Sequence, residues 1–161
     1  ASRGLGDVYK RQGLDYALEE PAIRTNVVGW TAAVDWAYGR FEERGGGHLV
    51  VITSVGGLRG GGAAPAYNAS KAYQINYAEG LRQRAAKSGL PLPVTDIRPG
   101  FVATEMAKGE GLFWVMPVDR VMEGIVRAIR RRRSVAVVTR RWRLPAWLIR
   151  HMPECIYRKM G

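Results

Sequence analysis

Three short runs rich in β-branched and apolar residues alternate with helical stretches along this chain of 161 residues. The runs are HLVVITS (48–54), VTDIRP (94–99) and SVAVVT (134–139). Runs of this length and composition indicate strands that are buried on both faces. Because strands that alternate with helices usually form a parallel sheet covered on both sides, the sequence predicts an α/β fold with three strands flanked by helices.

Helical periodicity marks the segments around these strands. The predicted helices cover 14–44, 65–88, 118–132 and 142–161. Glycines at 45–47 and Gly89 are expected to end the first two helices, and Pro65 suits the first turn of the second. The last segment is basic and amphipathic, with an expected break near Pro153.

The second predicted helix begins with PAYNASKAYQINY, where Tyr67 stands four residues before Lys71. Side chains at this spacing share one face of a helix. A free phenol has a pKa of about 10, and a neighbouring ammonium group favours its ionised form. A tyrosine in such a setting can exchange a proton with a substrate oxygen. Taken alone, the same pair is more often an ordinary surface contact.

Further polar residues follow the predicted strands, where parallel sheets bind their ligands. Ser54 ends the first strand, and its hydroxyl either holds a carbonyl oxygen or caps a turn. After the second strand, Pro99 and Gly100 form a turn that lets another group approach the backbone, and Thr104 offers a hydrogen bond or a helix cap. Asn26, inside the first helix, indicates a kink or a polar role, unless it faces solvent.

Four segments, NVVG, VVITSVGG, YNASK and RPGFVAT, resemble the second half of a short-chain dehydrogenase/reductase. The resemblance extends over about residues 14–140. It implies a partial Rossmann-type, doubly wound sheet and a catalytic set of Asn26, Ser54, Tyr67 and Lys71. Tyr67 would be the general acid/base, and Lys71 would assist it and hold the nicotinamide ribose. Ser54 would polarise the substrate carbonyl, and Asn26 would keep a water in a proton relay.

The same resemblance implies an oxidoreductase that moves a hydride between NAD or NADP and a small-molecule carbonyl or secondary alcohol. The residues expected at the cofactor are Tyr67, Lys71, Pro99, Gly100, Val102 and Thr104. Those expected at the substrate are Ser54, Tyr67, Phe113 and Trp114. No metal is expected, and the residue that separates NAD from NADP would lie outside the matched half. The family commonly forms dimers through helices equivalent to 14–44 and 65–88, so a homo-oligomer is expected.

Residues 1–13 have no clear period and are expected to be a non-native or truncated leader. The catalytic half of the Rossmann-type domain would then cover 14–140, followed by a basic amphipathic helix at 141–161. The family's glycine-rich strand–turn–helix normally precedes the matched segments, so the N-terminal half would be missing. The strand at 48–54 would then have an unpaired edge.

Positive charge is concentrated near the end of the chain, because residues 120–161 hold 12 of the 25 Lys and Arg residues. This leaves alternatives to catalysis, namely an inactive fragment or a basic protein on a membrane surface, with Trp142 and Trp147 among the headgroups. The competing expectation is that the last helix packs on the sheet or roofs the substrate pocket. Nucleic-acid binding is disfavoured because the remaining charge is nearly balanced. The single cysteine, Cys155, and the lack of a signal peptide indicate the cytoplasm.

Overall fold

The structure is a computed structural model that describes residues 14–103 and 115–159. Its elements are α2 (Tyr16–Ile23), η1 (Arg24–Gly29), α3 (Trp30–Glu43), β1 (Leu49–Ile52), η2 (Val55–Leu58), α4 (Pro65–Ser88), β2 (Val94–Pro99), α5 (Val118–Arg130), β3 (Val135–Val138), η4 (Arg140–Trp142), α6 (Arg143–His151) and α7 (Glu154–Tyr157). The predicted alternation of helices and strands is confirmed, with most element ends shifted by no more than two residues, while the last predicted helix forms the two shorter helices α6 and α7.

The three strands form one parallel sheet in the order β1-β2-β3. Leu49 pairs with Val94 at one end of β1, and Asp96 pairs with Val135 on the other side of β2. β2 is the central strand, and its residues are buried almost throughout. Within the described residues β1 is an edge strand, as expected for the run at 48–54.

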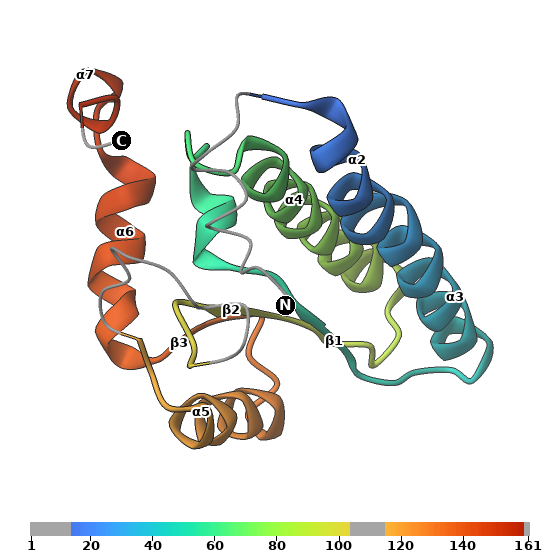
Figure 1. Ribbon diagram of the computed structural model, residues 1–161. Helices are drawn as coiled ribbons and strands as arrows, with labels where there is room; N and C mark the ends of the chain where they lie inside the picture. Colours follow the sequence, from blue (N-terminus) through green and yellow to red (C-terminus); the bar gives the residue numbers. More distant parts are fainter. Residues whose placement is uncertain (1–13, 104–114, 160–161) are drawn as a thin grey trace.

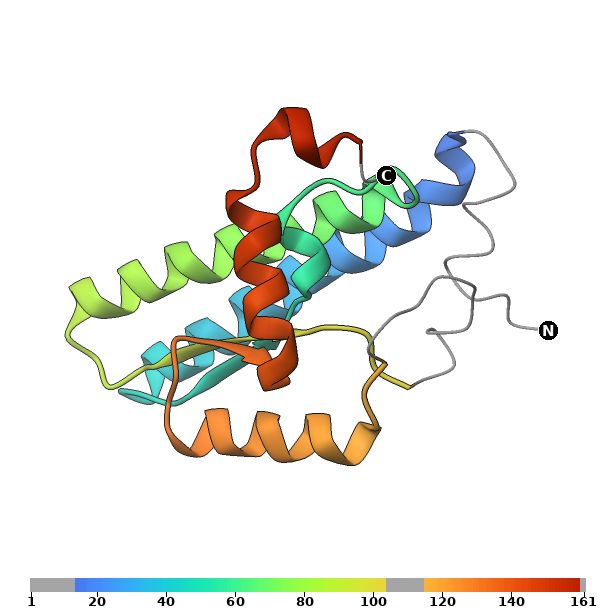
Figure 2. The same ribbon diagram turned by 90° about the vertical axis from the view of Figure 1, so that its left-hand side faces the viewer.

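Helices cover both faces of the sheet (Figures 1 and 2), with α3 and α4 on one side and α5 on the other. The core beneath α3 and α4 consists of Val34, Tyr38, Leu49, Val51, Ala78, Leu81, Ala85, Leu92 and Val94. The core beneath α5 consists of Ile97, Val121, Ile125, Ala128, Ala136 and Val138. This is the doubly covered parallel sheet of a Rossmann-type fold, so the predicted fold class is confirmed.

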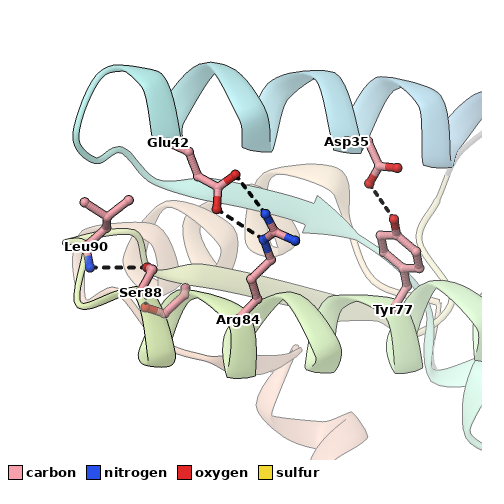
Figure 3. Close-up of polar contacts among 7 residues, drawn as sticks. Asp35, Glu42, Tyr77, Arg84, Ser88 and Leu90 are labelled. Carbon is pink, nitrogen blue, oxygen red and sulfur yellow. Dashed lines mark hydrogen bonds and ion pairs between the residues drawn. The ribbon is translucent and has the colours of Figure 1, made fainter.

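Two polar contacts join α3 to α4 along their solvent side (Figure 3). Tyr77 donates a hydrogen bond to Asp35, and Arg84 pairs with Glu42 through two nitrogens at 3.1 and 3.3 Å. These contacts supplement the apolar packing between the helices and hold α3 beside α4.

The first predicted helix runs from Tyr16 to Glu43 with one irregular section. Asp15 caps its start by accepting from the amide of Ala17 at 3.0 Å. The section Arg24–Gly29 is a π-helical turn, which inserts an extra residue into the helix. The irregularity expected around Asn26 is therefore present.

The C-terminal segment differs in part from the packing expectation. Trp142 is buried, with 2% of its surface exposed, so it is excluded from the headgroup position considered for it. Leu144 and Trp147 on α6 are 65% and 58% exposed, so the apolar side of this helix is largely uncovered. The break at Pro153 is confirmed, because α6 ends at His151 and α7 begins at Glu154.

None of the helices within 14–103 and 115–159 is both long and apolar enough to cross a membrane.

Candidate active site

The carboxyl end of β1 continues directly into a short turn, η2. Ser54 caps this turn, and its Oγ accepts a hydrogen bond from the amide of Gly56 at 3.0 Å. The capping role considered for Ser54 is thus present. The hydroxyl hydrogen has no acceptor among the described residues and can be donated to a ligand oxygen.

Glycines allow η2 to lie directly against α4. A Cβ on Gly57 would lie 2.6 Å from the carbonyl carbon of Lys71, so only a glycine fits this contact. A Cβ on Gly56 would lie 3.3 Å from Ser54 Oγ and 3.7 Å from Tyr67 Cε1. The serine hydroxyl and the tyrosine ring therefore border the same small space beside Gly56.

Tyr67 and Lys71 lie in the first half of α4, and both are half-buried. The Lys71 Nζ atom is 5.9 Å from the centre of the Tyr67 ring, a distance at which a cation still interacts with a ring face. The same Nζ donates to Gln74 Oε1 at 3.0 Å and lies 3.5 Å from the carbonyl oxygen of Ile52. Lys71 thus points toward the end of β1.

Opposing effects act on the charge of Lys71. Burial lowers the pKa of its ammonium group, and the negative charge of Asp96 acts in the opposite direction. Asp96 lies on β2 with 0% of its surface exposed. Its two oxygens accept from Thr53 at 2.7 Å and from the guanidinium of Arg98 at 2.7 Å. A buried, fully paired carboxylate therefore lies beneath the site.

Asn26 is tied to α4 by two hydrogen bonds. Its side-chain amide donates to Ser70 Oγ at 3.1 Å, and its main-chain carbonyl accepts from Gln74 Nε2 at 2.8 Å. Ser70 and Gln74 are each 1% exposed. Of the four predicted catalytic residues, Ser54 and Tyr67 thus border the space beside Gly56, Lys71 lies near the Tyr67 ring, and Asn26 is linked to Lys71 through Gln74. Their catalytic roles remain predictions.

The turn after β2 packs against a side chain of the C-terminal segment, and its expected contact with the cofactor stays a prediction. The Trp142 indole lies against Gly100, where a Cβ would be 2.3 Å from its ring. The group that approaches this glycine is therefore a side chain of the same protein. Pro99 ends β2 opposite Val138, and Val102 pairs with Met116 in an isolated bridge.

Three other predicted site residues, Thr104, Phe113 and Trp114, lie outside the described residues.

The C-terminal segment is attached to the loop that follows η2. Arg59 donates to the carbonyl oxygen of Met152 at 2.6 Å and pairs with Glu154 at 2.5 Å. Tyr157 donates to the carbonyl oxygen of Gly60 at 2.6 Å. The junction of α6 and α7 therefore lies against the loop that follows η2, and a roof over the substrate pocket stays a prediction.

Sequence reasoning missed Asn68 and Gln74. Asn68 donates to the carbonyl oxygen of Gly56 at 2.6 Å and so holds the η2 turn on α4. Gln74 continues the helical spacing of Tyr67 and Lys71 onto a stripe that is apolar further along the helix, at Ala78 and Leu81. A polar residue at the point where this helical stripe becomes apolar was the available signal.

No group of metal-ligating side chains occurs within the described part of the chain.

A separate, basic cavity of about 760 Å³ lies between α5, β3 and α6. Its lining includes Arg120, Arg127, Arg131, Arg133, Arg143 and Arg150. It lies beside β3, away from Tyr67 and Lys71, and contains none of the four predicted catalytic residues.

Comparison with known proteins gives a consistent family assignment. The short chain dehydrogenase family matches residues 4–112. An uncharacterized oxidoreductase of Mycobacterium tuberculosis (strain ATCC 25618 / H37Rv) is 36% identical over 118 residues, which are 72% of this chain and 46% of the relative. An acetoacetyl-CoA reductase of Shinella zoogloeoides is 30% identical over 108 residues, covering 63% of this chain and 44% of the relative. The chain thus spans somewhat less than half the length of these relatives.

Solved structures agree with the fold. A short-chain dehydrogenase from Sphingobium yanoikuyae in complex with NADPH is 25% identical, with a TM-score of 0.70 over 83% of this chain and 54% of that chain. A short chain dehydrogenase from Burkholderia cenocepacia J2315 in complex with NADP is 16% identical, with a TM-score of 0.79 over 99% of this chain and 66% of that chain.

Proposed function

Because the chain belongs to the short chain dehydrogenase family, we propose that it carries the proton-transfer corner of an NAD(P)-dependent oxidoreductase. The substrate is a small-molecule carbonyl or secondary alcohol. The observation that carries the proposal is the grouping of a hydroxyl, a phenol and an ammonium group, from Ser54, Tyr67 and Lys71, at the carboxyl end of β1. Ligands of parallel α/β sheets bind at this end.

The donors and acceptors of this corner fit a nicotinamide ribose. The Lys71 ammonium group has three N–H donors, and its described acceptors are Gln74 and, at a longer distance, Ile52. The Tyr67 hydroxyl has no hydrogen-bond partner among the described residues. Both groups can therefore bind ribose hydroxyls. Two relatives of known structure were solved with NADPH or NADP, which supports NAD(P) as the cofactor. When bound, it supplies or accepts the hydride.

The protein's own residues orient the substrate and move the proton. The Ser54 hydroxyl donates to the substrate oxygen and holds it beside the phenol. Tyr67 gives its proton to that oxygen during reduction and removes it during oxidation. Lys71 places positive charge near the phenol and stabilises the phenolate that forms. Asn26 contributes by fixing the segment that packs against α4.

The test is the oxidation of NADPH or NADH with a panel of ketones and aldehydes, followed by absorbance. It is run on the 161-residue chain and on the same chain extended by its native upstream sequence. Tyr67→Phe should lower kcat/KM by about 10²–10⁴-fold, because it removes the general acid/base. Tyr73→Phe is the matched control, since Tyr73 lies on the same helix but bonds to Thr31.

A Tyr67→Phe variant that keeps the wild-type rate would overturn the proposed role. Turnover in the extended chain but not in the 161-residue chain would support the alternative that this chain is an inactive fragment. The cytoplasm remains the proposed compartment.

A second candidate function is attachment to an anionic membrane surface, and the exposed apolar side of α6 favours it. Leu144, Trp147 and Leu148 are exposed on a helix that also carries Arg143 and Arg150. Such a helix can lie in the headgroup region of a bilayer. Co-sedimentation with vesicles containing anionic lipid tests this, using Trp147→Ser and the control Trp36→Ser, which changes a 70% exposed tryptophan on α3. Binding that does not depend on Trp147 argues against it.

We also propose a homo-oligomer formed through the first helix and α4. Trp36, Tyr16 and Val28 expose apolar surface on this side of the molecule. Light scattering after size-exclusion chromatography measures the mass, and a monomer at all concentrations contradicts the proposal. Nucleic-acid binding remains disfavoured.

A further inference from the structure

Gln74 joins two residues of the proposed site through a buried amide. Its Oε1 accepts from Lys71 Nζ at 3.0 Å, and its Nε2 donates to the main-chain carbonyl of Asn26 at 2.8 Å. An ammonium group can only donate and a carbonyl can only accept, so the two partners determine the orientation of the amide. The result is a bridge from Lys71 through Gln74 to the π-helical turn.

A purely packing role does not account for a glutamine at this position. Gln74 is 1% exposed and belongs to a buried stripe whose later members, Ala78, Leu81 and Ala85, are apolar. Burial of an unpaired amide is costly, whereas an apolar side chain would be accommodated on such a stripe. The glutamine is stabilised because both ends of its amide are hydrogen-bonded.

We propose that Gln74 is a positioning residue that holds the Lys71 ammonium group in the space shared by Tyr67 and Ser54, by anchoring it to the carbonyl of Asn26. The inference rests on the proposed function. It assigns Asn26 a role through its main-chain carbonyl and Gln74, where the family resemblance had implied a relay through a held water. A neutral amide does not exchange protons readily, so the bridge does not relay protons. Its role is instead to hold the Lys71 ammonium group in place and to favour its charged form.

The charge of Lys71 is the property that the bridge should control. The charged and titratable groups that face it are Tyr67 on α4 and Asp96 on β2, the latter paired with Arg98. The Gln74 carbonyl favours the ammonium form, against the effect of burial. Removal of this acceptor should therefore lower the pKa of Lys71 and leave its side chain less restrained.

The experiment is a pH titration of the lysine ε-carbon signals by NMR in the 161-residue chain labelled with ¹³C-lysine, with Lys71→Arg used for assignment. Gln74→Met keeps the length of the side chain but removes both hydrogen bonds, and should make Lys71 titrate at lower pH. Gln74→Glu keeps an acceptor for Lys71 and should make it titrate at higher pH than in the wild type. Ser70→Ala is the control, because it removes the other bond to Asn26 but leaves the lysine contact unchanged.

A structural role alone would lower the melting temperature of Gln74→Met without moving the Lys71 titration, and that result would overturn the inference. An equal shift in Ser70→Ala would also overturn it. If Gln74→Met does not fold, Gln74→Glu decides the question, since an unchanged titration there contradicts the bridge. The titration needs no turnover, so it separates failure of this inference from failure of the proposed oxidoreductase activity.

Discussion

The corner around Tyr67 and the basic region formed by α5, β3 and α6 use polar residues in opposite ways. In the corner, a few polar side chains are buried and paired at defined distances, as in the Lys71–Gln74–Asn26 bridge and the Asp96–Arg98 pair. The basic region contains many more charges around an open cavity of about 760 Å³. One described ion pair there, Arg120 with Glu123, spans 3.7 Å between exposed groups.

The difference shows that the number of charged residues in a segment does not indicate how much those charges contribute to the free energy of unfolding. An exposed ion pair contributes about 0–1 kcal/mol because water screens it. A buried polar group without its partner costs far more, because no water replaces the lost contact. Single changes among the buried, paired groups should therefore have large effects, and single changes among the exposed arginines of the basic region should have small ones.

The largest stability effect is expected for Arg98→Met. The substitution leaves the Asp96 carboxylate, which is 0% exposed, without its paired guanidinium, and the hydrogen bond that it keeps within 14–103 and 115–159 comes from Thr53. Loss of one member of a buried pair typically costs about 3–5 kcal/mol. Urea unfolding of both proteins measures the difference in the free energy of unfolding. If Arg98→Met changes the free energy of unfolding by less than the exposed-arginine variant Arg120→Gln does, the predicted difference between the two regions is wrong.

Gly57→Ala should have the next largest effect. Its new Cβ would lie 2.6 Å from the carbonyl carbon of Lys71 and 2.8 Å from the Ala72 nitrogen, so backbone atoms must move. Strain of this kind costs about 1–3 kcal/mol, and the displaced turn should carry Ser54 away from Tyr67. Gly60→Ala is the control, because a Cβ there meets nothing within 4 Å. Equal unfolding midpoints for the two variants would rule out the close contact as the cause.

Tyr77→Phe should have an effect between those of the buried contacts and the exposed ion pair. It removes one hydrogen bond between α3 and α4 (Figure 3). The hydrogen bond to Asp35, together with burial, raises the pKa of Tyr77 to about 12. The folded state therefore keeps this proton above the unfolded value of about 10, and the resulting stabilisation is full below pH 10 and is lost as the pH rises toward 12.

The Tyr77→Phe variant should lose about 0.5–1 kcal/mol at neutral pH and show a shallower alkaline loss of stability. Unfolding free energies measured from neutral to alkaline pH provide the test. Identical slopes in the two proteins would show that Tyr77 is not the group that titrates.

The smallest effect is expected for Arg120→Gln in the basic region. The side chain is 70% exposed, and its contact with Glu123 is long, so the free energy of unfolding should change by no more than about 0.5 kcal/mol. The same urea experiment measures it. A loss as large as that of Arg98→Met would remove the distinction between the two regions.

The sequence predicted those parts of the site that depend on local geometry. Tyr67 and Lys71 share a helical face because residues four apart always do, and Ser54 lies at a strand end because the β-branched run stops there. The irregular helix around Asn26 also followed from local propensity.

The contacts that the sequence did not predict join elements far apart in the chain. Trp142 occupies the space against Gly100, and Gln74 reaches the carbonyl of Asn26 across 48 positions. Trp142 and Trp147 belong to the same basic, amphipathic segment of the sequence, so nothing in the sequence was a reason to treat them differently. In the structure Trp142 is buried and Trp147 is exposed.

The amino-acid sequence by itself determined the order of the helices and strands, the parallel sheet, and the residues that share a helix face, because periodicity and backbone propensity act over a few residues. Only the tertiary structure decided that η2 packs on α4 through Gly57, that Gln74 bridges Lys71 to Asn26, and that the arginines of the last third line an open surface. The physical reason is that burial and hydrogen-bond partners depend on how elements pack in three dimensions, and that arrangement is not encoded in any short stretch of the chain.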